Sequence, residues 1–198
     1  MQDDSGAQVM FSVRNGPASL YKLKWDTQNF IELHEWCIHF PDGSGNPDAE
    51  DLALTDISSD NAIYACTERD DDGDAKDISK LSILRYSLVN DDTTGECISA
   101  SHEWDLTSVM PPCDPNKGFE GLTWLPDSVL VSQSFIDTST DEPYEPSRYP
   151  DHGGGVFFVS LEDAAHIYGV VVNYSNVTDF SVVVDFQGKM HHLLLVCL

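Results

Sequence analysis

Short apolar runs separated by turn residues constrain the fold of this 198-residue chain more than any other feature of its sequence. In residues 19–25, Tyr21, Leu23 and Trp25 alternate with two lysines, and residues 82–88 show a similar alternation. This period of two is typical of half-buried antiparallel strands, whose successive side chains point to opposite faces. No helical stripe longer than two turns occurs, so the sequence predicts an all-β fold.

The runs recur in two sets of four, which indicates a repeated sheet. One set spans residues 47–107 and the other spans residues 116–173, and each begins near a glutamate, Glu50 or Glu120. Four-stranded sheets repeated around a ring are the pattern of a β-propeller, which closes with about four to eight blades. We therefore expect a β-propeller, with a β-sandwich of about a dozen strands as the alternative.

The chain supplies only about three four-stranded antiparallel blades, fewer than a closed ring needs. Their expected boundaries are residues 8–40, 47–107, 116–173 and 179–198, of which the first and the last are incomplete. The sequence ends in an apolar segment without a polar tail. We therefore expect residues 1–198 to form one partial propeller domain, a fragment of a longer protein.

The charge balance narrows the choice of partners. The chain has 34 acidic against 10 basic residues, a net charge of −24. Nucleic acids and anionic membrane surfaces bind proteins through basic patches, so this composition argues against both. No apolar run approaches the roughly 18 residues that a membrane span needs. The excess of carboxylates favours a soluble surface, the binding of cations, or both.

Five cysteines lack the C-x-x-C spacing of common zinc sites, so a zinc site is not expected. They are Cys37, Cys66, Cys97, Cys113 and Cys197. Cys97 and Cys113 flank one predicted strand and are candidates for a disulfide, although spacing alone does not fix the pairing.

Two adjacent sequons occur near the end of the chain, at Asn173-Tyr-Ser and Asn176-Val-Thr. Such a motif accepts an N-linked glycan only in a secreted protein. The N-terminal residues show no apolar segment of a signal peptide.

Glu120 is the acidic residue whose position most calls for an explanation. It lies between Phe119 and Gly121 at the start of what the pattern indicates is a buried strand. A carboxylate without a partner costs several kcal/mol to bury. Two explanations stay open for Glu120 and for Glu50: each is a cation ligand, or each accepts hydrogen bonds from backbone amides of a neighbouring blade.

Several motifs together resemble the phytase-like β-propellers, a group of secreted proteins related to β-propeller phytases. They include "GNPDAEDLALT", "KGFEGLTWLPDSVLVSQSF" and "YPDHGGGVFFVSLED", and the resemblance covers most of residues 9–172. It implies a propeller fold and an extracellular location. What such proteins catalyse is less certain than their fold, because one fold serves many functions.

The resemblance also implies a calcium site. In phytase propellers, acidic motifs on the inner strands point carboxylates into the central channel, where calcium binds. Carried over by motif, the ligands are Asp48, Glu50, Asp51 and Glu120. Calcium takes six to eight oxygen ligands, which carboxylates supply. Gly121 would let the backbone approach closely.

Other polar residues are weaker candidates. The candidates for contact with a substrate are Arg69, Asp151 and His152. The alternative for Arg69 is an ion pair, and the alternative for Asp151 and His152 is a tight turn. The stretch that contains Glu68, Asp70 and Asp72 begins like a calcium-binding loop but has Ser79 where that loop needs Glu. A second, weak metal loop and a solvated acidic hairpin both stay open.

Two functions follow from the resemblance. The first is a non-catalytic or weakly active extracellular module with a calcium site. The alternative is a calcium-dependent phosphoesterase, whose channel carboxylates hold the metal and whose substrate is a small phosphorylated molecule. Only 10 basic residues are available to bind phosphate, and residues 179–198 contain no further acidic motif, which favours the first function. The partner of such a module would be a protein. The sequence identifies no catalytic residue.

Overall fold

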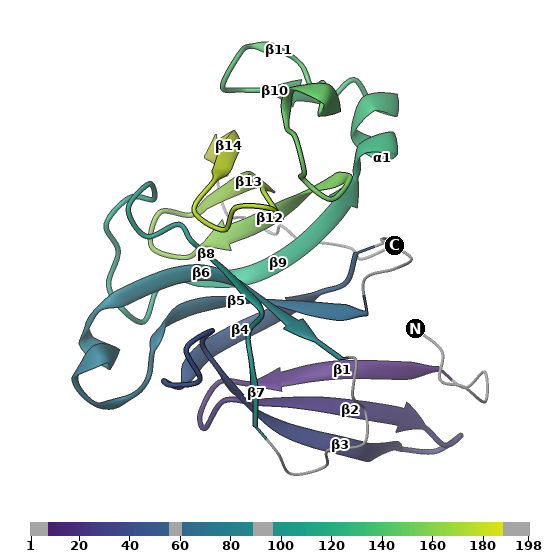
Figure 1. Cartoon of the computed structure of the whole chain (residues 1–198), viewed down its shortest axis with the longest axis vertical. Helices are drawn as coiled ribbons and strands as arrows, with labels where there is room; N and C mark the ends of the chain where they lie inside the picture. Colours follow the sequence, from purple (N-terminus) through teal and green to yellow (C-terminus); the bar gives the residue numbers. More distant parts are fainter. Residues whose placement is uncertain (1–7, 56–60, 89–96, 188–198) are drawn as a thin grey trace.

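The computed structural model describes residues 8–55, 61–88 and 97–187, and these form an all-β molecule with one short α-helix (Figure 1). Three four-stranded sheets and one two-stranded hairpin contain the described strands. Within these ranges no helix has the length and apolar character needed to cross a membrane.

The first sheet has the order β1-β2-β3-β7, in which β7 runs parallel to β3. Its strands are β1 (Val9–Arg14), β2 (Ser19–Trp25), β3 (Phe30–His39) and β7 (Cys97–Ser99). The second sheet, β4-β5-β6-β8, is antiparallel throughout. Its strands are β4 (Pro47–Ala53), β5 (Ala62–Asp70), β6 (Ser79–Ser87) and β8 (His102–Asp105), and a 3₁₀-helix, η1 (Gly73–Asp77), joins β5 to β6.

The third sheet, β9-β12-β13-β14, is also antiparallel. Its strands are β9 (Phe119–Pro126), β12 (Gly155–Leu161), β13 (His166–Val172) and β14 (Phe180–Gln187). Between β9 and β12 the chain makes an excursion through α1 (Asp127–Ser132), the hairpin β10 (Ile136–Asp137) and β11 (Glu142–Pro143), and η2 (Pro146–Arg148).

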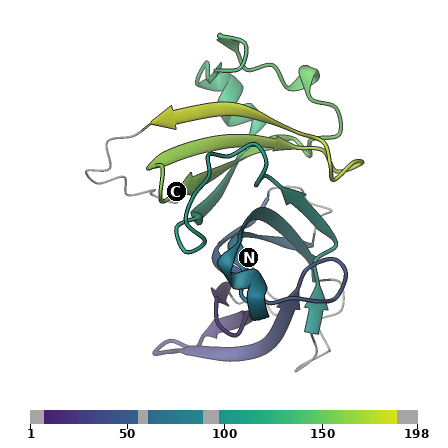
Figure 2. The same cartoon turned by 90° about the vertical axis from the view of Figure 1, so that its left-hand side faces the viewer.

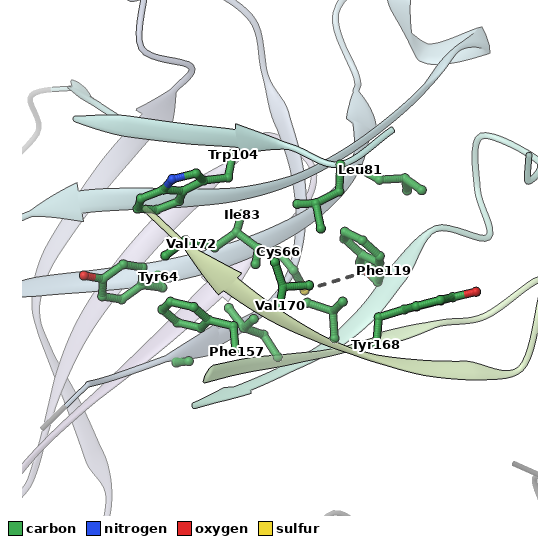
Figure 3. Packing of buried hydrophobic residues seen from close by; sticks show 14 of the residues in the cluster. Tyr64, Cys66, Leu81, Ile83, Trp104, Phe119, Phe157, Tyr168, Val170 and Val172 are labelled. Atoms are coloured by element: carbon green, nitrogen blue, oxygen red, sulfur yellow. Dashed lines mark hydrogen bonds between the residues drawn. The ribbon is translucent and has the colours of Figure 1, made fainter. Parts of the chain in front are cut away.

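The three sheets are stacked in chain order, and the α1–β11 excursion lies beyond the third (Figures 1 and 2). Alternation along β5 explains the stacking. Ile63 and Ala65 pack toward the first sheet, while Tyr64 and Cys66 pack toward the third, as Figure 3 shows for the latter core. The second sheet is therefore buried on both faces.

One edge strand of each sheet lies beside an edge strand of the next. β1 contacts β4, and β4 contacts β9. The backbone N–H of Leu122 on β9 donates to Oδ2 of Asp51 on β4 over 2.8 Å. The β1–β2 turn places Asn15 where its Nδ2 donates to Oε1 of Glu50 over 3.1 Å. Neighbouring sheets are thus joined along one edge by polar contacts.

Two predicted elements are corrected. Residues 116–173 were expected to form four strands and no helix, but α1 forms within them, and only Leu130 of its residues is buried. Leu130 packs with Tyr144 and with Val171 of β13, covering the outer face of the third sheet. The segment 179–198 was expected to begin a further blade. Instead β14 pairs with β13 and completes the third sheet, and residues 188–198 lie outside the described part of the chain.

The disulfide differs from the expected pair. Cys97 is bonded to Cys37, and Cys113 is a free thiol, as is the buried Cys66. The end of the set at residues 47–107, all of which was expected in one sheet, divides into β7 in the first sheet and β8 in the second. Because β7 pairs with β3 in a register that sets Cys37 opposite Cys97, the two sulfur atoms meet. Cys197 lies outside the described residues.

Candidate metal centre

Five carboxylates gather where the ends of four chain segments meet. Asp48 and Glu50 come from β4, Glu68 from β5, Glu120 from β9, and Glu162 from the turn after β12. One oxygen from each of Asp48, Glu50 and Glu68 lies within 4.8 Å of the others, and the same holds for Glu68, Glu120 and Glu162. Glu68 belongs to both groups and is therefore the middle of this acidic centre.

Irregular strand pairing and a glycine position Glu68. The register between β4 and β5 shifts on both sides of Ala49, and the register between β5 and β6 shifts between Thr67 and Arg69. These shifts interrupt the regular alternation of side chains around Glu68. The backbone N–H of Gly118 donates to Glu68 Oε1 over 2.7 Å. A Cβ at Gly118 would lie 2.8 Å from the Cα atom of Glu68. Only glycine lets this loop approach so closely.

Burial makes the centre electrostatically costly. Glu68 is 2% exposed and Asp48 is 3% exposed. The pKa of Glu68 is raised to about 7, first by burial and then by the nearby Glu120, Glu50 and Asp48, while the Gly118 hydrogen bond lowers it. Burial also raises the pKa of Asp48, although Arg69 Nη2 opposes this from 2.8 Å. Among the described residues, only Arg69 forms an ion pair with the five carboxylates.

Three of the four predicted metal ligands meet in this centre, and Asp51 does not. Its Oδ1 accepts the backbone N–H of Leu52 over 2.8 Å, and its Oδ2 accepts the backbone N–H of Leu122 on β9. Asp51 therefore links β4 to β9. Glu120 is exposed, so the expectation that it is buried was wrong. The close approach expected at Gly121 is present, because a Cβ there would lie 2.8 Å from Ser160 Oγ.

Two members of the centre had been assigned elsewhere or missed. In the sequence analysis, Glu68 was grouped with Asp70 and Asp72. Among the described residues, neither of these two aspartates belongs to a cluster of potential metal ligands. Asp70 Oδ1 instead accepts the backbone N–H groups of Asn46 and Asp72, over 2.8 and 3.2 Å. Glu162 had no signal in the sequence. It comes near Glu120 because Leu161 pairs with Phe119.

Of the three residues predicted to lie beside a substrate, only Arg69 reaches the centre. Arg69 pairs with Asp48, which was its alternative interpretation. Asp151 and His152 lie at the other end of the β9–β12 pair, where Gly155 opposes Pro126. His152 Nε2 is 2.8 Å from Asp127 Oδ2, and the backbone at Asp151 turns with a φ of 55°.

Comparison with known proteins adds no identification: no protein-family model, curated protein or solved structure matches the chain.

Proposed function

We propose that this protein is a calcium-binding, extracellular β-propeller module of the phytase-like type. The observation that carries the proposal is the position of Glu68, a buried carboxylate shared by two groups of potential ligands. Carboxylates held this close repel one another unless a cation or protons neutralise them. A divalent cation would relieve this repulsion at both groups.

The donor set suits calcium. The five side chains offer only carboxylate oxygens, which hard cations prefer. Calcium accepts six to eight oxygens in flexible geometry, so carboxylates from four separate segments, completed by water, would satisfy it. Magnesium demands a stricter octahedron and holds its water more tightly.

The arrangement of the sheets supports the propeller part of the proposal. Each four-stranded sheet packs against the next, and the edge strands β1, β4 and β9 follow one another along one side. In a propeller these would be the innermost strands. The acidic centre would then lie beside the central channel, because two of its members come from β4 and one from β9.

The Cys37–Cys97 disulfide supports the extracellular location. Disulfides persist in oxidising compartments and are rare in the cytosol.

A calcium-dependent phosphoesterase is the second candidate. The two clusters of carboxylates that share Glu68 could hold two cations side by side. Many phosphate-cleaving enzymes use such an arrangement. Bound metal would polarise a phosphate and lower the pKa of a water molecule. The single basic side chain at the centre is already paired with Asp48, so we propose the binding module first.

Calcium titration by calorimetry tests the proposal. The full chain should bind calcium with micromolar affinity, and Glu68→Gln should weaken binding by at least about tenfold because ligand charge sets affinity. Glu50→Gln and Glu120→Gln should weaken it less, since each belongs to one group only. Glu32→Gln on β3, an exposed acid away from the centre, is the matched control.

Two results would overturn the metal assignment: no calcium binding by the full chain, or equal binding by the Glu68→Gln and Glu32→Gln variants. Phosphate release from a phosphomonoester that stops with a chelator would favour the second candidate. Calcium binding without any release of phosphate would favour the non-catalytic binding module.

A further inference from the structure

The loop between β13 and β14, residues 173–179, contains both sequons, and the structure distinguishes their asparagines. Asn173 is half-buried at the start of the loop, whereas Asn176 is exposed in its middle. An N-linked glycan is bulky and needs a surface position. The question is which amide nitrogen, Nδ2, has room for a sugar.

The side chain and the carbonyl group of Asn173 form hydrogen bonds within the fold. Its Nδ2 donates to Asp179 Oδ2 over 3.1 Å, and its Oδ1 accepts the backbone N–H groups of Ser175 and Asn176. Its carbonyl oxygen accepts Trp104 Nε1–H over 3.1 Å. A sugar on Nδ2 would compete with the contact that closes the loop.

The residue after Asn173 is also part of the core. The hydroxyl of Tyr174 donates to that of Tyr64 over 2.8 Å, and its ring packs edge-on against Trp104. Gly153 is close enough that a Cβ there would lie 2.4 Å from this ring. The first sequon is therefore held against the body of the molecule.

Asn176 has the opposite surroundings. Its Oδ1 accepts the backbone N–H and the hydroxyl of Thr178, over 3.2 and 2.9 Å, which fixes the side chain. Its Nδ2 makes no hydrogen bond to any residue that the structure describes. Ser175, Val177 and Thr178 beside it are exposed. Folding therefore leaves this amide accessible.

We propose that Asn176, and not Asn173, is the acceptor of an N-linked oligosaccharide. The inference rests on the proposed extracellular location. The donor class is an oligosaccharide linked through a diphosphate to a lipid. The bond between sugar C1 and the diphosphate oxygen breaks, a bond between C1 and Nδ2 of Asn176 forms, and Nδ2 loses one proton. The lipid diphosphate leaves.

A glycan at this position would not cover the acidic centre. The backbone N–H of Tyr174 donates to the carbonyl of Asp151, so the sequon loop lies at the end of the third sheet where β12 begins. Glu120 and Glu162 lie at the other end. The sugar would mark one end of the sheet and leave the other open to solutes.

Intact mass spectrometry of the full chain, secreted from a eukaryotic host behind a cleavable leader, tests this. We expect one glycan, removed by an amidase that converts the acceptor to aspartate. Asn176→Asp keeps the Oδ1 acceptor and should abolish the glycan, as should Thr178→Val. Ser175→Ala destroys the first sequon without touching Asn173 and should leave the glycan in place.

Absence of a glycan from the secreted wild type would overturn the proposal, as would a glycan that survives Thr178→Val or disappears in Ser175→Ala. Calcium binding is measured on unglycosylated protein from bacteria. Failure of the metal proposal and failure of the glycan proposal are therefore separate results.

Discussion

Glu68 serves the fold and the acidic centre at the same time. One of its oxygens accepts the Gly118 N–H and so ties β5 to the segment before β9. Burial raises its pKa to about 7, so the metal-free folded protein keeps a proton on this side chain at a higher pH than the unfolded chain does. A cation that binds there must displace that proton, so we expect calcium affinity to rise with pH.

The raised pKa of Glu68 predicts how stability depends on pH without metal. The folded protein holds this proton more tightly than the unfolded chain, whose glutamate titrates near its ordinary pKa of 4.5. The free energy of unfolding should therefore fall as pH rises from about 4.5 to about 7, by up to about 3 kcal/mol from this group. Urea unfolding at pH 5 and pH 8 with a chelator measures the change.

Glu68→Gln should remove most of this decrease, and Glu32→Gln should leave it intact. Saturating calcium should reverse it in the wild type, because binding only to the folded state stabilises that state. An equal decrease in Glu68→Gln would show that other groups cause the pH dependence.

Gly118 is a second position where one residue decides local packing. Gly118→Ala would place a Cβ 2.6 Å from Leu81 Cδ2 and 2.8 Å from the Glu68 backbone. We expect a loss of about 1–3 kcal/mol, the usual cost of overpacking, together with weaker calcium binding. Thermal unfolding and calorimetry measure the two effects.

Gly73→Ala is the comparison for Gly118→Ala. No atom lies within 4 Å of a Cβ at Gly73, so only its φ of 55° opposes the change, at a cost of about 1 kcal/mol. Unchanged calcium binding in both variants would contradict the role given to Gly118.

Strands were predicted well where apolar and polar residues alternate, and poorly where the pattern is short. β2 and β6 form at the two runs in which this alternation was recognised. The run "SVLV" fits a helical turn as well as a strand over four residues, and packing of Leu130 beneath the excursion decides for α1. The division between β7 and β8 depends on pairing with two different sheets, which local pattern does not encode.

We expect the Cys37–Cys97 disulfide, which holds β7 in the first sheet, to raise the free energy of unfolding. It joins residues 60 positions apart, and a bond closing such a loop typically contributes about 2–4 kcal/mol. Cys37→Ser should lower the urea midpoint accordingly. Cys113→Ser should change it little, because Cys113 is unbridged. Equal midpoints for both variants would show that β7 is held by its backbone pairing alone.

The motif analysis found three of the five carboxylates of the acidic centre. Asp48, Glu50 and Glu120 stand in acidic motifs near strand starts, and such motifs are visible in a sequence. Glu68 and Glu162 enter through the β4–β5 shifts and the β9–β12 register, which become known only when strands are paired. The stacking of three sheets has no direct sequence signal beyond the double-sided burial of β5.

The charge of the whole molecule gives a further prediction. A net charge of −24 on 198 residues makes the compact state repel itself. Added sodium chloride should raise the melting temperature by screening, and calcium at equal ionic strength should raise it further through its site. In Glu68→Gln the two salts should act alike, and a persistent calcium advantage there would place the metal elsewhere.

The segment that supplies β7 to one sheet and β8 to the next also has a mechanical meaning. Its disulfide anchors it to β3, so Cys37 and Cys97, separated by 60 positions in the sequence, close a covalent loop. A force that pulls the two chain ends apart would bypass this loop, and the loop would not extend. At 3.3–3.6 Å per residue, roughly 200 Å of contour length stays hidden until a reductant opens the bond. In an optical trap the oxidised and reduced proteins would therefore differ in extension by about that amount, with the second sheet's β4, β5 and β6 shielded from the load.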